Sequence, residues 1–244
     1  MSARVTGAVA ARVLTQLRRD PRTIVLIVGV PCLLETLLKE IFAGRSDVFQ
    51  HTGAPLLGLF PFVTMFLVTS ITMLRERTSG TLERLMTLPL SKVDLLAGYG
   101  AAFAIVAAMQ AAVVSALTFG ALGLDVHGPR SLVAALAVAN AVLGTALGLF
   151  VSAFAQTEFQ AVQFMPAMVF PQVLLCGLFV PREQMAGWLR WLSDVLPFTY
   201  AYDALAHTAA DDLDARFAAD VGVVCGCIVL ALALGAATLR RRTD

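Results

Sequence analysis

The sequence is short of charged residues, which occupy only 14% of its 244 positions. Soluble domains carry charge on about a quarter of their residues, and roughly half of their residues are apolar. Here 58% of the residues are hydrophobic, so both quantities point to lipid as the solvent of much of the chain. The 18 basic and 17 acidic residues nearly cancel, so bulk charge gives no reason to expect nucleic-acid binding.

The sequence also lacks the short motifs of the common catalytic sites. It contains no G-x-x-x-x-G-K-[ST] phosphate loop, and no G-x-S-x-G, H-E-x-x-H or C-x-x-C. We therefore expect no enzyme activity in this chain and no cofactor bound to it. Any work that the protein does must draw its energy from a partner or from a gradient.

Cysteine and histidine are too few and too scattered for a disulfide framework or a metal site. The four cysteines lie in apolar stretches and the three histidines in predicted external segments: Cys32, Cys176, Cys225, Cys227, His51, His127 and His207. Asp211, Asp212 and Asp214 are spaced loosely like a cation site, but no turn glycine stands among them. We expect buried thiols, surface histidines and a solvated negative surface, and no metal.

What the sequence has instead is long apolar runs. A membrane-spanning helix needs about 20 mostly apolar residues to cross a hydrocarbon core of about 30 Å. Six segments qualify: 23–42, 53–74, 95–124, 132–155, 159–180 and 221–239. The predicted fold is an all-α membrane protein with six transmembrane helices, in which residues 1–22 precede a transmembrane domain over 23–244.

The basic residues predict the orientation of these spans. Twelve of the 18 fall in the N-terminal segment, in the loop after the second span, or in the C-terminal tail: Arg4, Arg12, Arg18, Arg19, Arg22, Arg75, Arg77, Arg84, Lys92, Arg240, Arg241 and Arg242. Lys and Arg concentrate on the cytoplasmic side of membranes. Both termini are therefore predicted to be cytoplasmic.

Residues 4–19 are predicted to form an amphipathic helix ahead of the first span. Val9, Val13, Leu14 and Leu17 recur at helical spacing on one face, and arginines gather on another. Such a helix is typical of the membrane interface, with its apolar face in lipid. The alternative is a basic tail that serves only topology.

The external stretch 181–220 contains both tryptophans of the chain, Trp188 and Trp191, followed by Tyr200 and Tyr202. Aromatic side chains with a polar edge favour the headgroup layer. We interpret this stretch as short amphipathic helices that dip into the outer leaflet before the last span without crossing it.

The cytoplasmic stretch between the second and third spans predicts a short amphipathic helix from Gly80 that Pro89 ends. Leu82, Leu85 and Met86 lie on one face of it. A helix of this kind suits insertion into a groove of another protein. A solvated charged loop explains the residues equally well.

The run from Glu76 to Leu85, E-R-T-S-G-T-L-E-R-L, resembles the E-R-x-x-G-T-L-E-x-L of ABC-2 type permeases, which include the daunorubicin-resistance and nodulation export permeases. A second segment resembles that family's G-x-x-x-P…P-x-T-Y region, where paired re-entrant helices precede the last span. In this chain that region contains Gly177, Pro181, Trp188, Trp191, Pro197 and Tyr200. Arg19-Asp20-Pro21-Arg22 resembles the family's junction into the first span.

The resemblance implies a permease subunit of an exporter in a bacterial plasma membrane, working with a separate ATPase subunit that binds ATP and Mg²⁺. Two permeases, identical or different, would pair with two ATPases and move a drug-like or lipid substrate by alternating access. The implied ATPase contacts are Glu76, Arg77, Gly80, Thr81, Leu82, Glu83, Arg84, Leu85 and Pro89. A gradient-driven secondary transporter and a membrane scaffold are the alternatives.

The first span departs from the family because it contains Glu35, Lys39 and Glu40. A charge far inside a membrane is costly unless it is paired or faces water. Glu35 either lines a substrate path, together with Asn140 and Gln163, or pairs locally with Lys39 four residues on. The default role for Asn140, Gln163 and the other polar side chains in the spans is interhelical hydrogen bonding.

Overall fold

The computed structural model describes residues 3–81 and 92–238, and in this part of the chain all regular structure is helical. The helices are α1 (Ala3–Arg18), α2 (Pro21–Ile41), α3 (Ser46–Thr78), α5 (Lys92–Ala116), α6 (Arg130–Val151), α7 (Glu158–Leu175), α8 (Gly187–Val195), α9 (Pro197–Ala209) and α10 (Ala215–Thr238). A π-helical turn, η1 (Leu117–Ala121), continues α5, and a 3₁₀ turn, η2 (Arg182–Gln184), precedes α8. The predicted all-α fold is confirmed.

A helix lies at each of the six predicted spans. Four helical stretches are long and apolar enough to cross a membrane: Ser46–Thr78, Asp94–Ala121, Arg130–Val151 and Ala215–Thr238. The other two, α2 and α7, are weaker candidates. Glu35, Lys39 and Glu40 lower the apolar character of α2, and α7 has only 18 residues, with Pro166 and Pro171 inside it.

The helices differ in extent from the apolar runs. At about 1.5 Å per residue, the 33 residues of α3 measure about 50 Å, well beyond a hydrocarbon core of about 30 Å. The helix therefore continues past the predicted span at both ends. In contrast, α7 ends at Leu175, before the predicted 180. Gly177 follows with φ +104°, a left-handed conformation that ends the helix.

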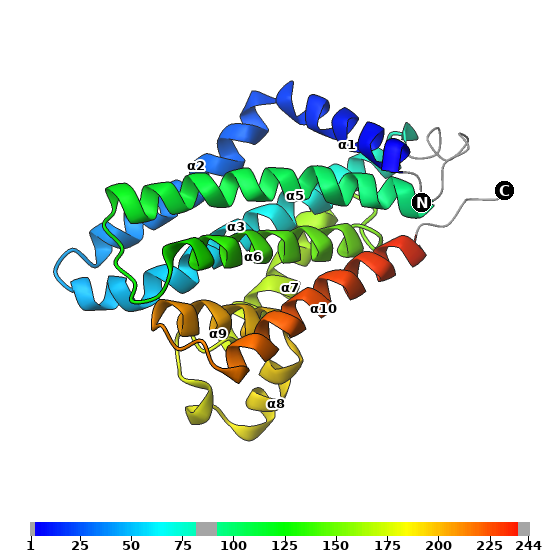
Figure 1. Ribbon diagram of the computed structural model, residues 1–244. Helices are drawn as coiled ribbons and strands as arrows, with labels where there is room; N and C mark the ends of the chain where they lie inside the picture. Colours follow the sequence, from blue (N-terminus) through cyan, green and yellow to red (C-terminus); the bar gives the residue numbers. More distant parts are fainter. Residues whose placement is uncertain (1–2, 82–91, 239–244) are drawn as a thin grey trace.

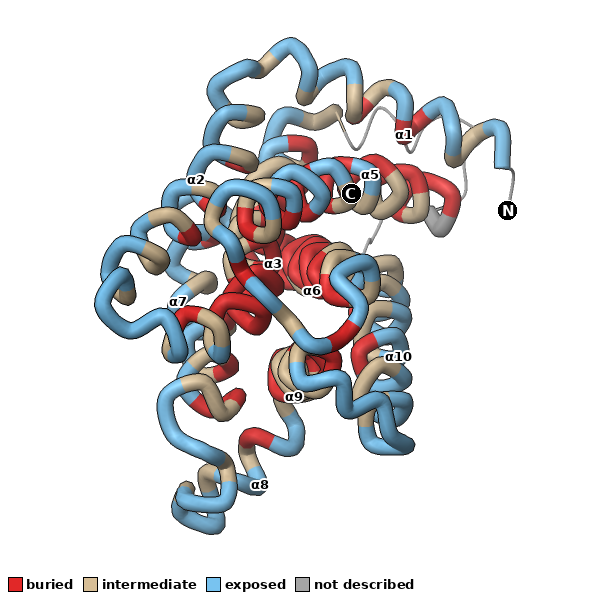
Figure 2. Tube along the Cα trace, turned by 60° about the vertical axis from the view of Figure 1, so that its left-hand side comes forward, coloured by how far each residue is buried: buried red, intermediate tan, exposed pale blue. Residues whose placement is uncertain are grey.

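The centre of the bundle is the pair α3 and α6, which Figure 2 shows as the most buried helices. Two glycines let their backbones approach closely. A side chain at Gly148 would place its first carbon 2.5 Å from the carbonyl oxygen of Phe66, and one at Gly144 would collide with that of Phe62. Small residues serve this purpose at helix interfaces in membranes.

The cytoplasmic segments of the prediction lie together at one end of the molecule. The start of α1, the end of α3, the start of α5 and the end of α10 all lie on the right in Figure 1. The connections after α2 and α5 lie at the opposite end. This arrangement agrees with the sidedness that the basic residues predict.

The predicted amphipathic helix exists as α1, but two of the four side chains on its apolar face do not point outward. Val9 and Val13 are buried, and they pack with Leu95, Leu96 and Tyr99 of α5 in one apolar cluster. The expectation that these side chains enter lipid is wrong. The first turns of α5 offer a protein surface that covers them instead. Gly98 permits this contact, since a side chain there would place its first carbon 2.6 Å from Val9.

Candidate functional site

The described part of the predicted coupling segment is the C-terminal end of α3. Glu76 and Arg77 belong to the last turn of this helix rather than to a loop. Ser79 caps the turn by donating its N–H to the carbonyl of Arg75, and Gly80 follows with φ +71°. Glycine in this left-handed conformation is the usual residue just beyond a helix end. The short helix predicted from Gly80 lies, beyond Thr81, outside the described residues.

The other predicted coupling residues, Leu82, Glu83, Arg84, Leu85 and Pro89, lie outside the described residues. Their predicted contact with an ATPase stays a prediction. The described flank of the segment nevertheless shows how this end of the molecule is held together.

Glu76 joins three helices through one hydrogen-bond network. Arg12 of α1 donates from a single guanidinium nitrogen to both carboxylate oxygens of Glu76, at 3.0 and 3.1 Å, and from the other to the hydroxyl of Tyr99 on α5, at 3.3 Å. The Glu76 side chain is only 4% exposed, whereas that of Arg12 is 35% exposed. The family resemblance implies an ATPase contact for Glu76; in this structure its carboxylate points to α1. Arg12 and Tyr99 were missed as its partners.

A second ion pair joins the end of α3 to the start of α7. The guanidinium of Arg75 donates to both carboxylate oxygens of Glu158, at 2.7 and 3.0 Å. Both side chains are more than half exposed, so this pair adds less stability than one shielded from water. This ion pair holds the start of α7 next to the end of α3. Arg77, which follows Glu76 in the last turn of α3, has two buried guanidinium nitrogens without a hydrogen-bond partner in the described part of the chain.

The predicted ion pair between Glu35 and Lys39 is wrong. Glu35 is fully buried, and neither of its carboxylate oxygens has a hydrogen-bond partner. The ammonium of Lys39 instead lies 4.8 Å from the centre of the Phe49 ring, a cation–π contact with α3. The Phe49 ring thus occupies the place next to the Lys39 ammonium that the Glu35 carboxylate would need for an ion pair.

The three residues suggested for a substrate path do not share one surface. Glu35 and Asn140 are buried within the bundle, and Asn140 packs beside Gly58 of α3. Gln163 is exposed on α7. Of the polar residues in the spans, Gln172 bears out the expected hydrogen bonding between helices, since its side-chain oxygen accepts from the backbone N–H of Phe198 at the start of α9.

The external segment folds into the short helices α8 and α9. Pro197 opens α9, whose Phe198, Ala201 and Leu205 are buried against the bundle. In contrast, α8 stands away from the other helices in Figure 2, and Trp188 and Trp191 on it are each 69% exposed. The 13 residues of α9 are too few to cross a membrane. Short helices before the last span are therefore present as predicted, while their entry into the outer leaflet stays a prediction.

Arg182 organises this segment. It forms ion pairs with Asp194 of α8 and with Asp203 of α9, the latter at 2.9 Å. Tyr200 adds a hydrogen bond at 2.6 Å from its hydroxyl to the carbonyl oxygen of Asp194. Of the residues predicted for this segment, Gly177 and Pro181 line a cavity of about 610 Å³ together with Arg182 and Asp203. Burial raises the pKa of Asp203 to about 6, although Arg182 opposes the shift.

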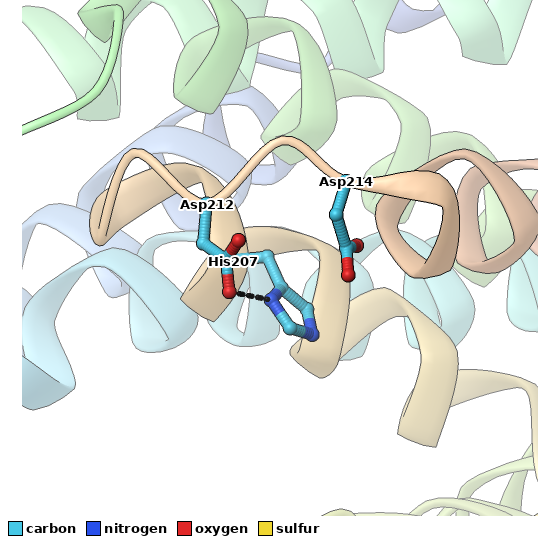
Figure 3. A group of neighbouring side chains, drawn as sticks. All are labelled: His207, Asp212 and Asp214. Atoms are coloured by element: carbon cyan, nitrogen blue, oxygen red, sulfur yellow. Dashed lines mark ion pairs between the residues drawn. The ribbon is translucent and has the colours of Figure 1, made fainter.

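The same cavity brings together residues that the sequence placed far apart. His51 and His207 both line it. In Figure 3, His207 at the end of α9 faces Asp212, with its Nδ1 at 3.5 Å from the carboxylate, and Asp214 lies beside them. The ligand atoms of these three residues lie within 4.8 Å of one another. Asp214 accepts hydrogen bonds from the backbone N–H groups of Arg216 and Phe217 and so caps α10, which explains its position without an ion.

Comparisons with known proteins give one consistent result. Residues 4–209 match the family model described as ABC-2 type transporter. The probable multidrug ABC transporter permease YbhR of Escherichia coli is 29% identical over 68% of this chain and 46% of its own length. The linearmycin resistance permease protein LnrN of Bacillus subtilis is 26% identical over 72% of this chain and 44% of its own.

A eukaryotic relative is also similar. ABC transporter G family member 20 of Dictyostelium discoideum is 24% identical over 70% of this chain, a match that takes up only 24% of that protein. The matched part of this chain therefore spans less than half the length of these relatives.

Proposed function

The chain belongs to the ABC-2 type transporter family, and on this premise we propose that it is the membrane subunit of an ATP-driven exporter. Permeases of this family work with ATP-binding subunits, and no phosphate loop occurs in this sequence. The energy would therefore come from a separate subunit that binds ATP and Mg²⁺. Two permeases and two such subunits would form the working complex, with both termini in the cytoplasm of a bacterial cell.

The observation that carries the proposal is the way in which the predicted cytoplasmic segment is joined to α3 and α5. The family-like run begins in the last turn of α3 and leads towards α5, two helices that extend through most of the bundle. A force applied to this segment would act directly on both helices. Transport by alternating access requires two packings whose relative stability a partner can shift. Nucleotide binding and hydrolysis would supply that shift through residues 76–89.

The described spans support a hydrophobic or amphiphilic substrate, because each of the four long apolar helices contains an 18-residue stretch with at most two charged side chains. A drug-like molecule and a lipid fit equally well. The printed names of the two bacterial relatives refer to multidrug transport and linearmycin resistance, and this favours a drug-like compound.

The decisive experiment is co-purification followed by transport in sealed vesicles. The chain is expressed with a candidate ATP-binding subunit, and export of a panel of amphiphilic compounds is followed with and without ATP. Replacing Glu83 with Ala should release the ATPase and abolish ATP-dependent export. Glu183→Ala, an exposed carboxylate at the external end, is the matched control and should change neither. Export that continues without ATP, driven by an ion gradient, would instead support a secondary transporter.

A further inference from the structure

An apolar groove of about 190 Å³ is lined by residues of α1, α2 and α5. Figure 1 shows the angle that α1 and α2 form beside α5. Its lining is aliphatic apart from one residue, Arg18. The other lining residues are Leu14, Leu17, Ile24, Ile27, Val106 and Met109. No such groove was predicted from the sequence, because its walls come from three helices separated by up to 95 positions.

The groove opens towards the surroundings of the bundle. Met109 on its wall is 48% exposed, and its neighbour Ile105 is 55% exposed. Across the groove, Val25 and Leu26 of α2 are also exposed. Apolar side chains that stay exposed on a spanning bundle face lipid tails, so the groove is continuous with a surface that acyl chains cover.

Positively charged side chains lie at the corner between α1 and α2, next to the groove. Arg18 lines the groove, and Arg19 and Arg22 lie within four positions of it in the sequence. All three are exposed, and none forms an ion pair with a residue in the described part of the chain. The one carboxylate at the corner, Asp20, accepts hydrogen bonds from the backbone and hydroxyl of Thr23. Within the described residues, these arginines therefore have no ion-pair partner.

Contacts between the three helices hold the walls of the groove in place. Gln110 of α5 donates a hydrogen bond of 2.7 Å to the backbone carbonyl of Ile27. This bond is fully buried and holds α2 against α5 at the inner edge of the groove. The apolar face of α1, packed on α5 around Val9 and Val13, holds the other edge. The cavity is thus bounded by contacts that do not depend on what fills it.

We propose that this groove binds one acyl chain of an anionic glycerophospholipid of the cytoplasmic leaflet, whose phosphate is held by the arginines at the corner. Guanidinium groups suit phosphate recognition because their donors match its oxygens in pairs. Burial of the chain against six aliphatic side chains supplies the apolar part of the affinity. The lipid would join α1 to the first span and stabilise the corner between them. The inference depends on membrane insertion and not on the proposed transport activity.

The test is native mass spectrometry. The full chain is released from detergent in the presence of defined lipids, and the lipids bound to it are measured. Phosphatidylglycerol and phosphatidylcholine with identical acyl chains are titrated, and the short glycerophosphoglycerol headgroup serves as a chain-free competitor. We expect phosphatidylglycerol to bind more tightly than phosphatidylcholine and the headgroup alone not to compete. Arg18→Gln should weaken phosphatidylglycerol binding roughly five-fold, the effect of one basic residue near an anionic lipid, while Arg18→Lys should retain most of it.

Two further variants test the groove itself. Met109→Phe adds bulk at the partly exposed mouth, where folding tolerates it, and should weaken binding of both lipids. Ile105→Phe on the same helix but outside the groove, and Arg4→Gln on α1 far from the corner, are matched controls and should bind as the wild type does. Equal binding of the two lipids, or equal effects of Arg18→Gln and Arg4→Gln, would overturn the proposal. So would a change in subunit number on Met109→Phe with lipid binding unchanged, which would assign the groove to a second copy of the chain.

Discussion

At the scale of single residues, the most unusual side chain is Glu35. It is fully buried in a helix that forms part of the bundle, and its oxygens have no hydrogen-bond partner. By contrast, Glu76, the other buried glutamate among the described residues, is paired with Arg12. An unpaired acid inside a membrane helix is expensive and commonly functional. Glu35 is therefore the residue of the first span whose replacement is most informative.

Replacing Glu35 with Gln keeps the shape of the side chain and removes its charge. We expect the variant to fold, because a neutral amide at a buried site costs less than an unpaired charge. If Glu35 recognises positively charged substrates, their export should fall roughly ten-fold, the loss of one contact to a charged group. Export of neutral compounds should not change. Transport assays in vesicles with both substrate types measure the difference.

Glu40→Gln is the matched control, since Glu40 lies on the same helix but is exposed. It should export both substrate types as the wild type does. Unchanged export of cationic compounds by Glu35→Gln would end the idea that this carboxyl contacts the substrate.

Asp203 gives a residue-level prediction about pH. Its pKa is raised by burial to about 6 from an ordinary value near 4. A carboxyl with a raised pKa in the folded state favours folding most when it is protonated. Its contribution is therefore complete below about pH 4 and is lost as the pH rises through about 6.

The variant Asp203→Asn should remove this dependence. Between pH 7.5 and pH 5 the wild type should gain stability relative to the variant by on the order of 1–2 kcal/mol, allowing for a side chain that is partly exposed. Unfolding midpoints in detergent at the two pH values measure the gain. Asp194→Asn, which removes the other and more exposed partner of Arg182, is the control. An equal gain in the wild type and in Asp203→Asn would show that Asp203 does not titrate in this range.

At the scale of elements, the cytoplasmic end is held by contacts between helices that are distant in sequence. Arg12 and Glu76 are 64 positions apart, and they link α1 to α3 while Tyr99 adds α5. Removing one partner of such a pair leaves the other charge buried and unpaired. The cost then falls mainly on the residue that cannot reach water, which here is Glu76.

A double-mutant cycle tests this link. Arg12→Met alone should destabilise the protein by about 2–4 kcal/mol, because Glu76 is left buried. Adding Glu76→Leu should recover most of that loss, giving strong non-additivity. The free energy of unfolding and the protease susceptibility of α1 are the measurements. The exposed pair Arg75 and Glu158, changed to Met and Leu in the same way, should lose at most about 1 kcal/mol. Additive effects at Arg12 and Glu76 would contradict the link.

Much of this element structure could be predicted from the sequence, because the signals are local. Long apolar runs placed a helix at each of the six predicted spans, although α3 continues beyond the predicted 74 to Thr78. The predictions that failed concern what a given side chain or helix face packs against. The apolar stripe of α1 is the same whether it meets lipid or α5, so amphipathicity alone did not decide between them. Likewise, Glu35 and Lys39 lie four residues apart on one helix, a spacing that allows an ion pair, yet the Lys39 ammonium contacts the ring of Phe49 instead.

The candidate site was predictable to the extent that it is contained in one stretch. Residues 76–81 were located by their pattern. The Arg12 and Tyr99 contacts, the ion pairs of Arg182 and the meeting of His51 with His207 depend on how helices pack, and nothing in the local sequence signals them. The family resemblance fixed the kind of protein, while the network around Glu76 required the structure.

At the scale of the whole molecule, function depends on which end faces the ATPase. The start of α1, the end of α3, the start of α5 and the end of α10 lie at one side of the molecule (Figure 1). The charged cavity, which His51 near the start of α3 lines together with Arg182 and Asp203, lies towards the other side, so the two ends differ chemically. An ATP-binding subunit works in the cytoplasm, so the end of α3 must lie there if the proposal is right. The basic residues of α1 and of the corner before α2 favour the same orientation.

Single cysteines in a chain whose four native cysteines are replaced can test this orientation. A membrane-impermeant maleimide applied to intact cells should label Asp125→Cys and Trp188→Cys, because both side chains are well exposed at the predicted external end. Ser79→Cys, at the end of α3, should react only after the membrane is opened. Labelling of Ser79→Cys in intact cells would place the coupling segment outside. No ATP-binding subunit could then reach it, and the transport mechanism proposed for this chain would fail with that one result.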